Sequence, residues 1–134
     1  MTNPADRTRW IEHKGERILF YDFSGLEDTD AGLRVIAASK GRAVDQPPHS
    51  VRTLVDVRGS HFDARITRAL QDLARDNKPQ VLASAVVGVS GLQRVILAAV
   101  SRVTRRKFAT FDTVDAAKDW LVEQRPQGPG GAEL

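Results

Sequence analysis

Small polar and acidic residues follow three apolar runs that read as strands. The candidate ligand-binding residues in these turns are Asp22, Ser24, Asp56, Ser60, Gly88, Ser90 and Gly91. Ligands of open α/β sheets bind beyond the carboxyl ends of parallel strands, so we expect the three turns to meet. The last turn precedes an apparent helix, whose N-terminal N–H groups suit an anion. A purely structural interpretation also holds, in which Gly88 makes the turn and Ser90 caps the helix, since the glycine spacing of a phosphate loop is missing.

Two of these residues carry the charge that metal chemistry requires. Asp22 and Asp56, together with Ser90, are of the types that hold Mg²⁺ in phosphoryl-transfer sites. A third acidic ligand is not evident in the sequence. In the alternative interpretation, each aspartate satisfies loop N–H groups or pairs with an arginine such as Arg58. We therefore predict no metal site and no cofactor.

The histidines give no stronger indication of catalysis. His13, His49 and His61 are far apart, and no pair has the i, i+4 spacing of metal ligands on a helix. Ser60, His61 and Asp63 include the residue types of a hydrolytic triad, but three such close neighbours seldom reach the required geometry. The chain has no cysteine, which excludes thiolate chemistry. We expect no catalytic residues and no enzymatic activity.

Hydrophobic periodicity predicts the elements that would position these residues. Apolar runs predict strands at 8–13, 17–23, 51–57, 81–87 and 108–111. Helical spacing and capping residues predict helices at about 28–41, 63–77, 90–103 and 112–122. The first two strands form a hairpin, and strand–helix units follow. The predicted fold is α/β, a mixed five-stranded sheet with about four helices.

The segment 81–103 gives the strongest local signal. Its strand is apolar without alternation, as when both faces of a parallel strand are covered. The helix after it has an expected buried stripe at Leu92, Val95, Ile96, Ala99, Val100 and Val103. Leu97 lies off that stripe, and a helix that is apolar beyond its core stripe often meets a partner. The candidate partner-contact residues are therefore Leu97, Arg94, Arg102, Arg105 and Arg106, although the arginines could simply offset the helix dipole.

Length and composition set the outer limits. The 134 residues suit one domain at 8–123, after a flexible segment 1–7 and before a polar tail, 124–134, expected to be disordered. The net charge of +3 is spread along the chain, which does not favour nucleic-acid binding. The sequence contains no long apolar run and no signal peptide, so we expect no membrane association and a cytoplasmic location.

Several segments resemble the STAS family of anti-sigma factor antagonists and related modules. They are WIEHKGERILFYDFSGL at 10–26, LVDVRG at 54–59, AVVGVSGLQRVILAAVSR at 85–102 and FDTVDAAKDWL at 111–121. The resemblance implies a STAS-like fold and a regulatory role. Antagonists of this family carry a phosphorylated serine next to an aspartate at the start of one helix. Asp63 matches that aspartate, but Ala64 and Arg65 replace the hydroxyl residues. The chain thus looks like an uncharacterised branch of the family.

Three functions remain open. The first is a non-enzymatic module that docks on an unidentified protein partner or on a second copy of itself, through the helix that carries Leu97. The alternative is a domain that binds a small anionic or lipid-like ligand with the turns at the strand ends. A metal-dependent, phosphatase-like enzyme using Asp22 and Asp56 is a third, less supported possibility.

Overall fold

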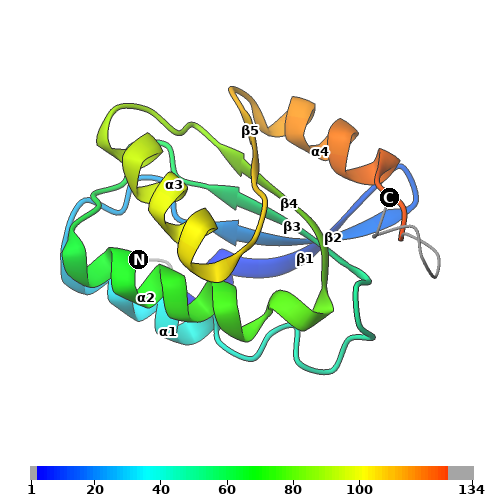
Figure 1. Ribbon diagram of the computed structural model, residues 1–134, viewed down its shortest axis with the longest axis horizontal. Helices are drawn as coiled ribbons and strands as arrows, with labels where there is room; N and C mark the ends of the chain where they lie inside the picture. The colour runs from blue at the N-terminus through cyan, green and yellow to red at the C-terminus, as the bar shows by residue number, and fades with distance from the viewer. Residues whose placement is uncertain (1–2, 127–134) are drawn as a thin grey trace.

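The chain begins with an antiparallel hairpin. The computed structural model describes residues 3–126 (Figure 1). Strands β1 (Thr8–His13) and β2 (Glu16–Asp22) pair from Thr8 opposite Tyr21 to His13 opposite Glu16. Lys14 and Gly15 join them with positive φ angles of 52° and 83°, the backbone of a tight hairpin turn. This part of the fold was predicted correctly.

Three further strands extend the sheet in parallel. They are β3 (Val51–Asp56), β4 (Val81–Val87) and β5 (Ala109–Phe111), and the sheet order is β1-β2-β3-β4-β5. β2, β3, β4 and β5 run parallel, so β1 makes the sheet mixed. The predicted α/β fold with a five-stranded mixed sheet and four α-helices is confirmed within the described residues.

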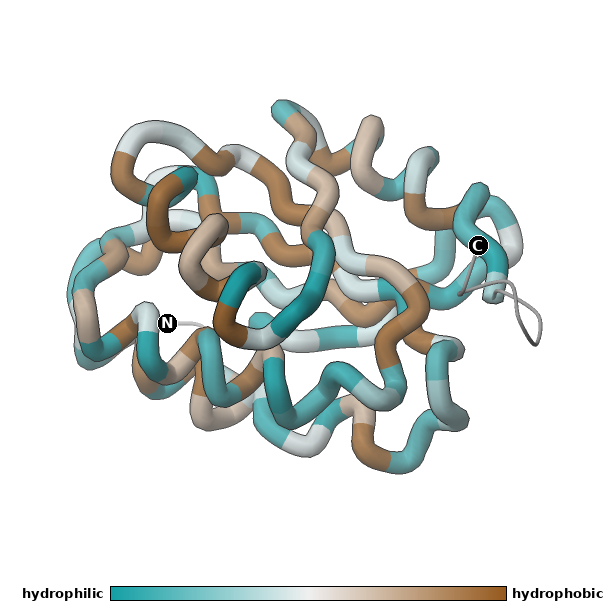
Figure 2. Tube along the Cα trace, in the orientation of Figure 1, coloured by the Kyte–Doolittle hydropathy of each residue, from teal (hydrophilic) through white to brown (hydrophobic). Residues whose placement is uncertain are grey.

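Helices cover both faces of the sheet unequally. Helices α1 (Thr29–Ser39), α2 (Ala64–Asp76) and α3 (Leu92–Thr104) lie on one face, and α4 (Val114–Glu123) lies alone on the other (Figure 1). Because successive strand residues point to opposite faces, Leu54 and Ala85 pack toward α4. Tyr21 and Val86 point to the three-helix face. Figure 2 shows hydrophobic segments along β3, β4 and α3.

Most helix starts follow their capping residues. The carboxylates of Asp28 and Asp63 accept from the N–H groups of Ala31 and Ile66, and Thr113 caps α4 in the same way. The prediction that Ser90 caps α3 is wrong. The N-cap is Gly91, with a φ of 52° that suits glycine, and no side chain caps this end.

Helix α3 faces the core differently from the prediction. Its inner side is formed by Gln93, Ile96, Leu97, Val100 and Thr104. Three residues of the expected buried stripe, Leu92, Val95 and Val103, are instead among the most exposed large hydrophobic side chains. Two polar contacts hold the helix in this orientation. The Gln93 amide donates to the backbone carbonyls of Val57 and Ser60, and Thr104 is buried with its hydroxyl on the Val100 carbonyl.

The two chain ends were expected to be flexible. Pro4–Arg7 forms a 3-10 turn (η1), and Arg7 Nη1 donates to the carbonyls of Asp22 and Ser24 at 3.2 and 2.8 Å. Arg52 Nη2 donates to the Gln124 carbonyl at 2.7 Å. The predicted disorder of the tail beyond residue 126 lies outside the described residues. No helix among residues 3–126 is long and apolar enough to cross a membrane.

Candidate functional site

The three strand-end turns lie side by side, as expected for parallel strands. The N–H of Phe23 donates to the Asp56 carbonyl at 2.9 Å, and that of Gly25 donates to the Arg58 carbonyl at 2.9 Å. The N–H of Val57 reaches the Val87 carbonyl at 3.0 Å. Backbone hydrogen bonds therefore join the turns directly and leave few of their N–H groups free for a ligand.

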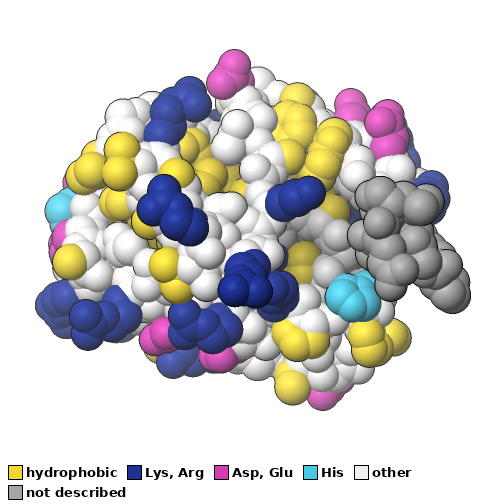
Figure 3. Space-filling model, viewed as in Figure 1, with side chains coloured by type: hydrophobic (Ala, Val, Ile, Leu, Met, Phe, Trp, Pro, Cys, Tyr) yellow, Lys and Arg dark blue, Asp and Glu magenta, His cyan; other side chains and the backbone are white. Residues whose placement is uncertain are grey.

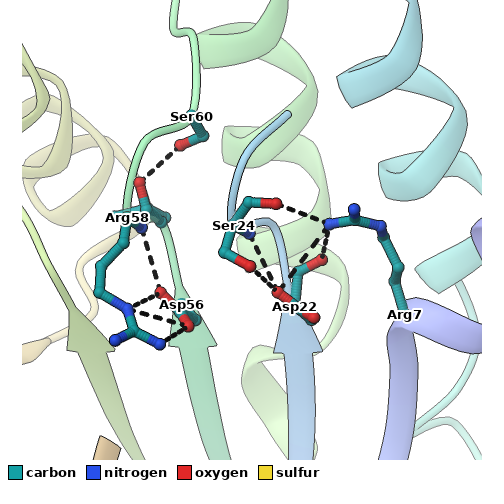
Figure 4. A network of polar contacts seen from close by, with 7 residues as sticks. Arg7, Asp22, Ser24, Asp56, Arg58 and Ser60 are labelled. Carbon is teal, nitrogen blue, oxygen red and sulfur yellow. Dashed lines mark hydrogen bonds and ion pairs between the residues drawn. The ribbon is translucent and has the colours of Figure 1, made fainter. Parts of the chain in front are cut away.

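Asp22 is engaged by its own turn. Its carboxylate accepts from the backbone N–H of Ser24 at 3.0 Å and from the Ser24 hydroxyl at 2.5 Å (Figure 4). The guanidinium of Arg7 lies 3.9 Å away. Asp22 and Ser24 thus form a local turn motif with an arginine beside it.

Asp56 is paired with Arg58. The carboxylate is buried and accepts from the Arg58 backbone N–H at 3.1 Å, from Nε at 3.0 Å and from Nη2 at 2.7 Å (Figure 4). This charge-assisted contact raises the pKa of Arg58 above its ordinary value. Among the described residues, no group of three or more His, Asp or Glu side chains is placed to hold a metal ion.

The other strand-end candidates are likewise part of the framework. The Ser60 hydroxyl donates to the Val57 carbonyl at 2.7 Å. Gly88 has a φ of 83°, and a Cβ on it would lie 2.1 Å from Cγ of Arg58. Ser90 and Gly91 are exposed, and the Ser90 carbonyl accepts from the Gln93 N–H at 3.0 Å. The structure brings the predicted residues together, but the side chains of Asp22, Asp56 and Ser60 form hydrogen bonds within their own turns.

A cavity lies elsewhere, between the sheet and helices α2 and α3. Its volume is about 80 Å³. Side chains of α3 form the wall opposite the strands. The wall is almost wholly apolar, and Val55, Val86, Leu73, Ile96 and Leu97 contribute to it.

Polar residues of the cavity wall gather beneath the C-terminal end of α3. Arg106 Nη1 donates to the carbonyl of Ala74 at 2.9 Å and to Oδ1 of Asn77 at 2.6 Å. The Asn77 amide donates to the Tyr21 hydroxyl at 3.2 Å. Arg106 Nη2 donates to the hydroxyl of Ser84 at 2.5 Å. Tyr21, Asn77 and Arg106 all line the cavity.

Arg106 is a buried cation without an acidic partner. Its exposed fraction is 8%, and no Asp or Glu of residues 3–126 lies within ion-pair distance of it. Burial lowers its pKa to about 10, because the charged form has lost water. Burial likewise raises the pKa of Tyr21, which leaves a neutral hydroxyl beside the guanidinium. The polar end of the cavity therefore carries one positive charge.

Comparison with known proteins identifies the fold. No protein-family model matches the sequence, and no match was found among curated proteins. Among solved structures, the chain is similar to an uncharacterised protein of the DUF3478 family from Shewanella loihica PV-4, which is described as having a SpoIIAA-like fold. The TM-score is 0.60 at 15% sequence identity, and the match covers 85% of this chain and 91% of the other.

The fold is SpoIIAA-like. The STAS resemblance implied this fold from the hairpin, the order of the elements and a few short motifs. At 15% sequence identity, the structural match establishes the fold but does not indicate a function. The function therefore rests on the residues of this chain.

Within the SpoIIAA-like fold, the start of α2 holds a tightly bonded carboxylate. Asp63 accepts from the Ile66 N–H at 2.9 Å and from the Thr29 hydroxyl. The Thr29 contact is the main reason that the pKa of Asp63 is lowered to about 2. Asp63 therefore fixes the helix start and ties it to α1.

The predicted partner-contact residues divide into two groups. Arg106 is buried, which excludes it from an exposed patch, and Leu97 is half-buried with part of its side chain in the cavity wall. Arg106 is turned inward because Arg105 adopts a left-handed φ of 57° that redirects the chain after the helix. Leu97 also lines the groove beside α3, so a partner contact at Leu97 stays a prediction. Nothing in the sequence indicated that Arg106 would be buried, since it follows another arginine and precedes a lysine.

The remaining predicted residues lie on the outer side of α3. Arg94, Arg102 and Arg105 are exposed beside the apolar residues Leu92, Val95 and Val103. Figure 3 shows hydrophobic and basic side chains on the face that carries α3. The helix itself contains no acidic residue. The outer side of α3 is therefore apolar and basic together.

Proposed function

We propose that this protein is a non-enzymatic module that holds a small, slim apolar ligand in the cavity beneath α3. The observation that carries the proposal is the apolar cavity itself, enclosed between β3, β4 and helices α2 and α3. Binding sites for small molecules are concave, mostly apolar and supplied with a few polar groups, and this cavity has those properties. It replaces the strand-end turns as the candidate site.

The size of the cavity restricts the ligand. About 80 Å³ is roughly half of the ~150 Å³ that admits a benzene molecule in an engineered apolar cavity. A ring would require α3 to move, whereas an unbranched chain requires less width. A groove beside α3 shares Val89, Leu97 and Phe108 with the cavity wall, which gives a longer chain a route outward.

The state of the carboxylates supports binding over catalysis. Asp22 and Asp56 accept hydrogen bonds from their own turns and from Arg58. A general base or a metal ligand requires a carboxylate that can reach a substrate or an ion. No carboxylate lines the cavity.

Titration with octan-1-ol, followed by NMR, tests the proposal. Backbone amides of Val55, Val86 and Ile96 should shift, whereas those of Leu54 and Ala117, on the α4 face, should not. Shifts spread evenly over both faces, or none at millimolar alcohol, contradict the proposal.

A variant that fills the cavity provides the matching test. Ala74→Leu places a larger side chain in the cavity wall, and Ala37→Leu makes the same change on an exposed part of α1, away from the cavity and the groove. The first should abolish the shifts and the second should retain them. Equal binding by both variants would show that the alcohol binds elsewhere.

The outer side of α3 favours a second candidate function, docking to an acidic protein. Leu92, Val95 and Val103 are exposed on one helix, and Arg94, Arg102 and Arg105 accompany them. A second copy of this chain would bring like charges together across such a contact, which opposes self-association. An acidic, amphipathic partner surface complements both the charge and the apolar residues.

Two matched substitutions test the docking surface. Val95→Asp and Val44→Asp introduce the same charge at residues that are 65% and 66% exposed, but only Val95 lies on α3. A partner captured by the wild-type protein should be acidic and should protect α3 from hydrogen exchange. Val95→Asp should lose it and Val44→Asp should keep it. Equal capture by both variants, or protection away from α3, rejects this function.

A further inference from the structure

The charge balance of the cavity narrows the class of ligand. Among residues 3–126, Arg106 is the one fully charged side chain in the cavity wall. A second buried arginine shows the contrast. Arg52 is also 8% exposed and also bonds to a helix end, with Nε on the Leu121 carbonyl at 2.9 Å, but Glu16 lies 3.4 Å from its Nη2. A buried charge is costly unless it is paired. Arg52 faces a carboxylate, whereas the Arg106 guanidinium lies 4.8 Å from the centroid of the Phe108 ring and faces no carboxylate within residues 3–126.

Hydrogen bonding to the protein leaves part of Arg106 unused. A guanidinium has five N–H donors. Nη1 reaches Ala74 and Asn77, and Nη2 reaches Ser84, but within residues 3–126 neither Nε–H nor the second Nη2–H has an acceptor. The Tyr21 hydroxyl accepts from Asn77, and its own proton has no acceptor in the same part of the chain. Donors from β2 and from the segment before β5 are thus available at one end of the cavity.

We infer that the cavity binds an unbranched monocarboxylate, with its carboxylate on Arg106 and Tyr21 and its hydrocarbon chain beneath α3. This deepens the proposed binding function and rests on it. One unpaired positive charge calls for one negative charge, which favours a carboxylate over a phosphate dianion. A guanidinium edge and a carboxylate also match in geometry, because both are planar and can form two parallel hydrogen bonds.

The hydrocarbon chain follows from the rest of the wall. From the polar end, Val86, Val55, Ile96 and Val57 continue the cavity toward Gln93. Gln93 and Thr104 are separated by about 16 Å along the helix at about 1.5 Å per residue. Apolar side chains thus line most of that length, and a chain that fills it has to displace some of them, because the open volume is about 80 Å³. The Gln93 amide is already bonded to Val57 and Ser60, so it closes the far end without requiring a polar ligand group there.

Arg106 also has a structural role, and the experiment has to separate the two. Its bonds to Ala74 and Asn77 satisfy the C-terminal end of α2, where a cation is favourable. If that were its whole purpose, the cavity would not prefer an anion to an uncharged ligand of the same length. The decisive comparison is therefore between ligands on the unaltered protein.

Octanoate and octan-1-ol form the matched pair, measured by NMR titration of the wild-type protein at pH 7. A hydrogen bond to a charged group contributes about 1.5–3 kcal/mol, so octanoate should bind about ten to a hundred times more tightly than the alcohol. Octanoate should also shift the Nε–H resonance of Arg106, whereas the alcohol should not. Inorganic phosphate, which has no chain, should leave the cavity resonances unchanged.

Each outcome has a distinct meaning. Equal affinity for octanoate and octanol retains the proposed binding function and rejects Arg106 as the anchor. Binding of neither ligand rejects both proposals. Tighter binding of phosphate than of octanoate rejects the monocarboxylate and points to an anion site without a chain.

Substitution gives an independent readout. Arg106→Gln retains amide donors but removes the charge, and Arg52→Gln is the control on the opposite face of the sheet. Arg106→Gln should reduce octanoate affinity to that of octanol, while Arg52→Gln should leave the ratio unchanged. If Arg106→Gln does not fold, the ligand comparison and the Nε–H shift on the wild-type protein decide the question alone.

Discussion

Two valines on α3 distinguish the observed orientation of this helix from the one predicted by sequence. Periodicity places both Val95 and Val100 in one buried stripe. In the structure Val95 is 65% exposed and Val100 is 5% exposed. Val95→Ala and Val100→Ala are the same chemical change on the same helix, so a difference in stability reports burial. The gain in helix propensity, up to about 0.7 kcal/mol, is common to both and cancels in the comparison.

The expected magnitudes follow from these exposures. Replacement of valine by alanine removes two carbon atoms. Each buried carbon contributes about 0.8 kcal/mol to the free energy of unfolding, so the loss at full burial is about 1.6 kcal/mol. Scaled by burial, Val100→Ala costs about 1.5 kcal/mol and Val95→Ala about 0.6 kcal/mol before the propensity gain. Val100 also lines the cavity, so its truncation enlarges a space already present, which adds a further penalty. The two variants should therefore differ by about 1 kcal/mol or more.

Urea unfolding followed by circular dichroism measures this difference. Both variants should keep the slope of the wild-type transition, so that the midpoints can be compared directly. Val95→Ala should lie close to the wild type, and Val100→Ala should unfold at clearly lower urea. Equal losses would refute the orientation of α3, and with it the position of the cavity beneath that helix.

Two further predictions concern the turns and the helix start. The pKa of Asp63 lies at about 2 in the folded protein, below the value of about 3.9 expected when unfolded, so its stabilising effect is present above pH 4 and disappears as the pH falls toward 2. Asp63→Asn keeps a capping acceptor but does not titrate. The urea midpoint of the wild type should therefore approach that of the variant as the pH falls from 5 to 2.5. A constant difference between the two midpoints would show that the Asp63 carboxylate is not the source of the pH dependence. Gly88→Ala should destabilise the protein more than Gly25→Ala: both glycines have positive φ, but only at Gly88 would a Cβ meet the Arg58 side chain and, at 3.2 Å, its Cα. Equal melting temperatures for these two variants would show that the close approach at Gly88 is unimportant.

Local signals in the sequence were sufficient for the elements and their order. The hairpin around Lys14 and Gly15 and the caps at Asp63 and Thr113 depend on residues within a few positions of one another. Parallel pairing of the later strands could be predicted because a helix connects each of them to the next. These features, with the short motifs, were enough to predict a STAS-like fold.

The orientation of α3 depends on contacts that are distant in sequence. Gln93 is a polar residue at an inner position because it donates to Val57 and Ser60, more than thirty positions away. Thr104 is buried, and its carbonyl accepts from Lys78 Nζ at 3.1 Å. Hydrophobic periodicity assigns polar residues such as these to the surface. The predicted buried face of α3 is therefore displaced around the helix toward Val95. The same rotation of the helix relative to the prediction brings Leu97 to the cavity wall.

At the strand-end turns, the sequence indicated where the residues lie but not what their side chains contact. The sequence predicted correctly that Asp22 and Asp56 would lie at one edge, because parallel strands bring their carboxyl ends together. It could not show that Ser24 and Arg58 donate to these carboxylates, or that the Arg7 guanidinium lies 3.9 Å from the Asp22 carboxylate. The interpretation of these aspartates as turn residues agrees with those contacts.

The two faces of the sheet differ in how completely they are closed. On the α4 face, Leu54, Ala85 and Leu121 are fully buried, and Arg52 is balanced by Glu16. On the other face, α3 leaves a cavity, and the cation inside it, Arg106, has no such counterpart within the described chain. Both arginines satisfy a helix end, so that role does not explain the difference between them. A ligand carboxylate at Arg106 would give the second face the charge balance that Glu16 gives the first, and its chain would occupy the space that α3 leaves open.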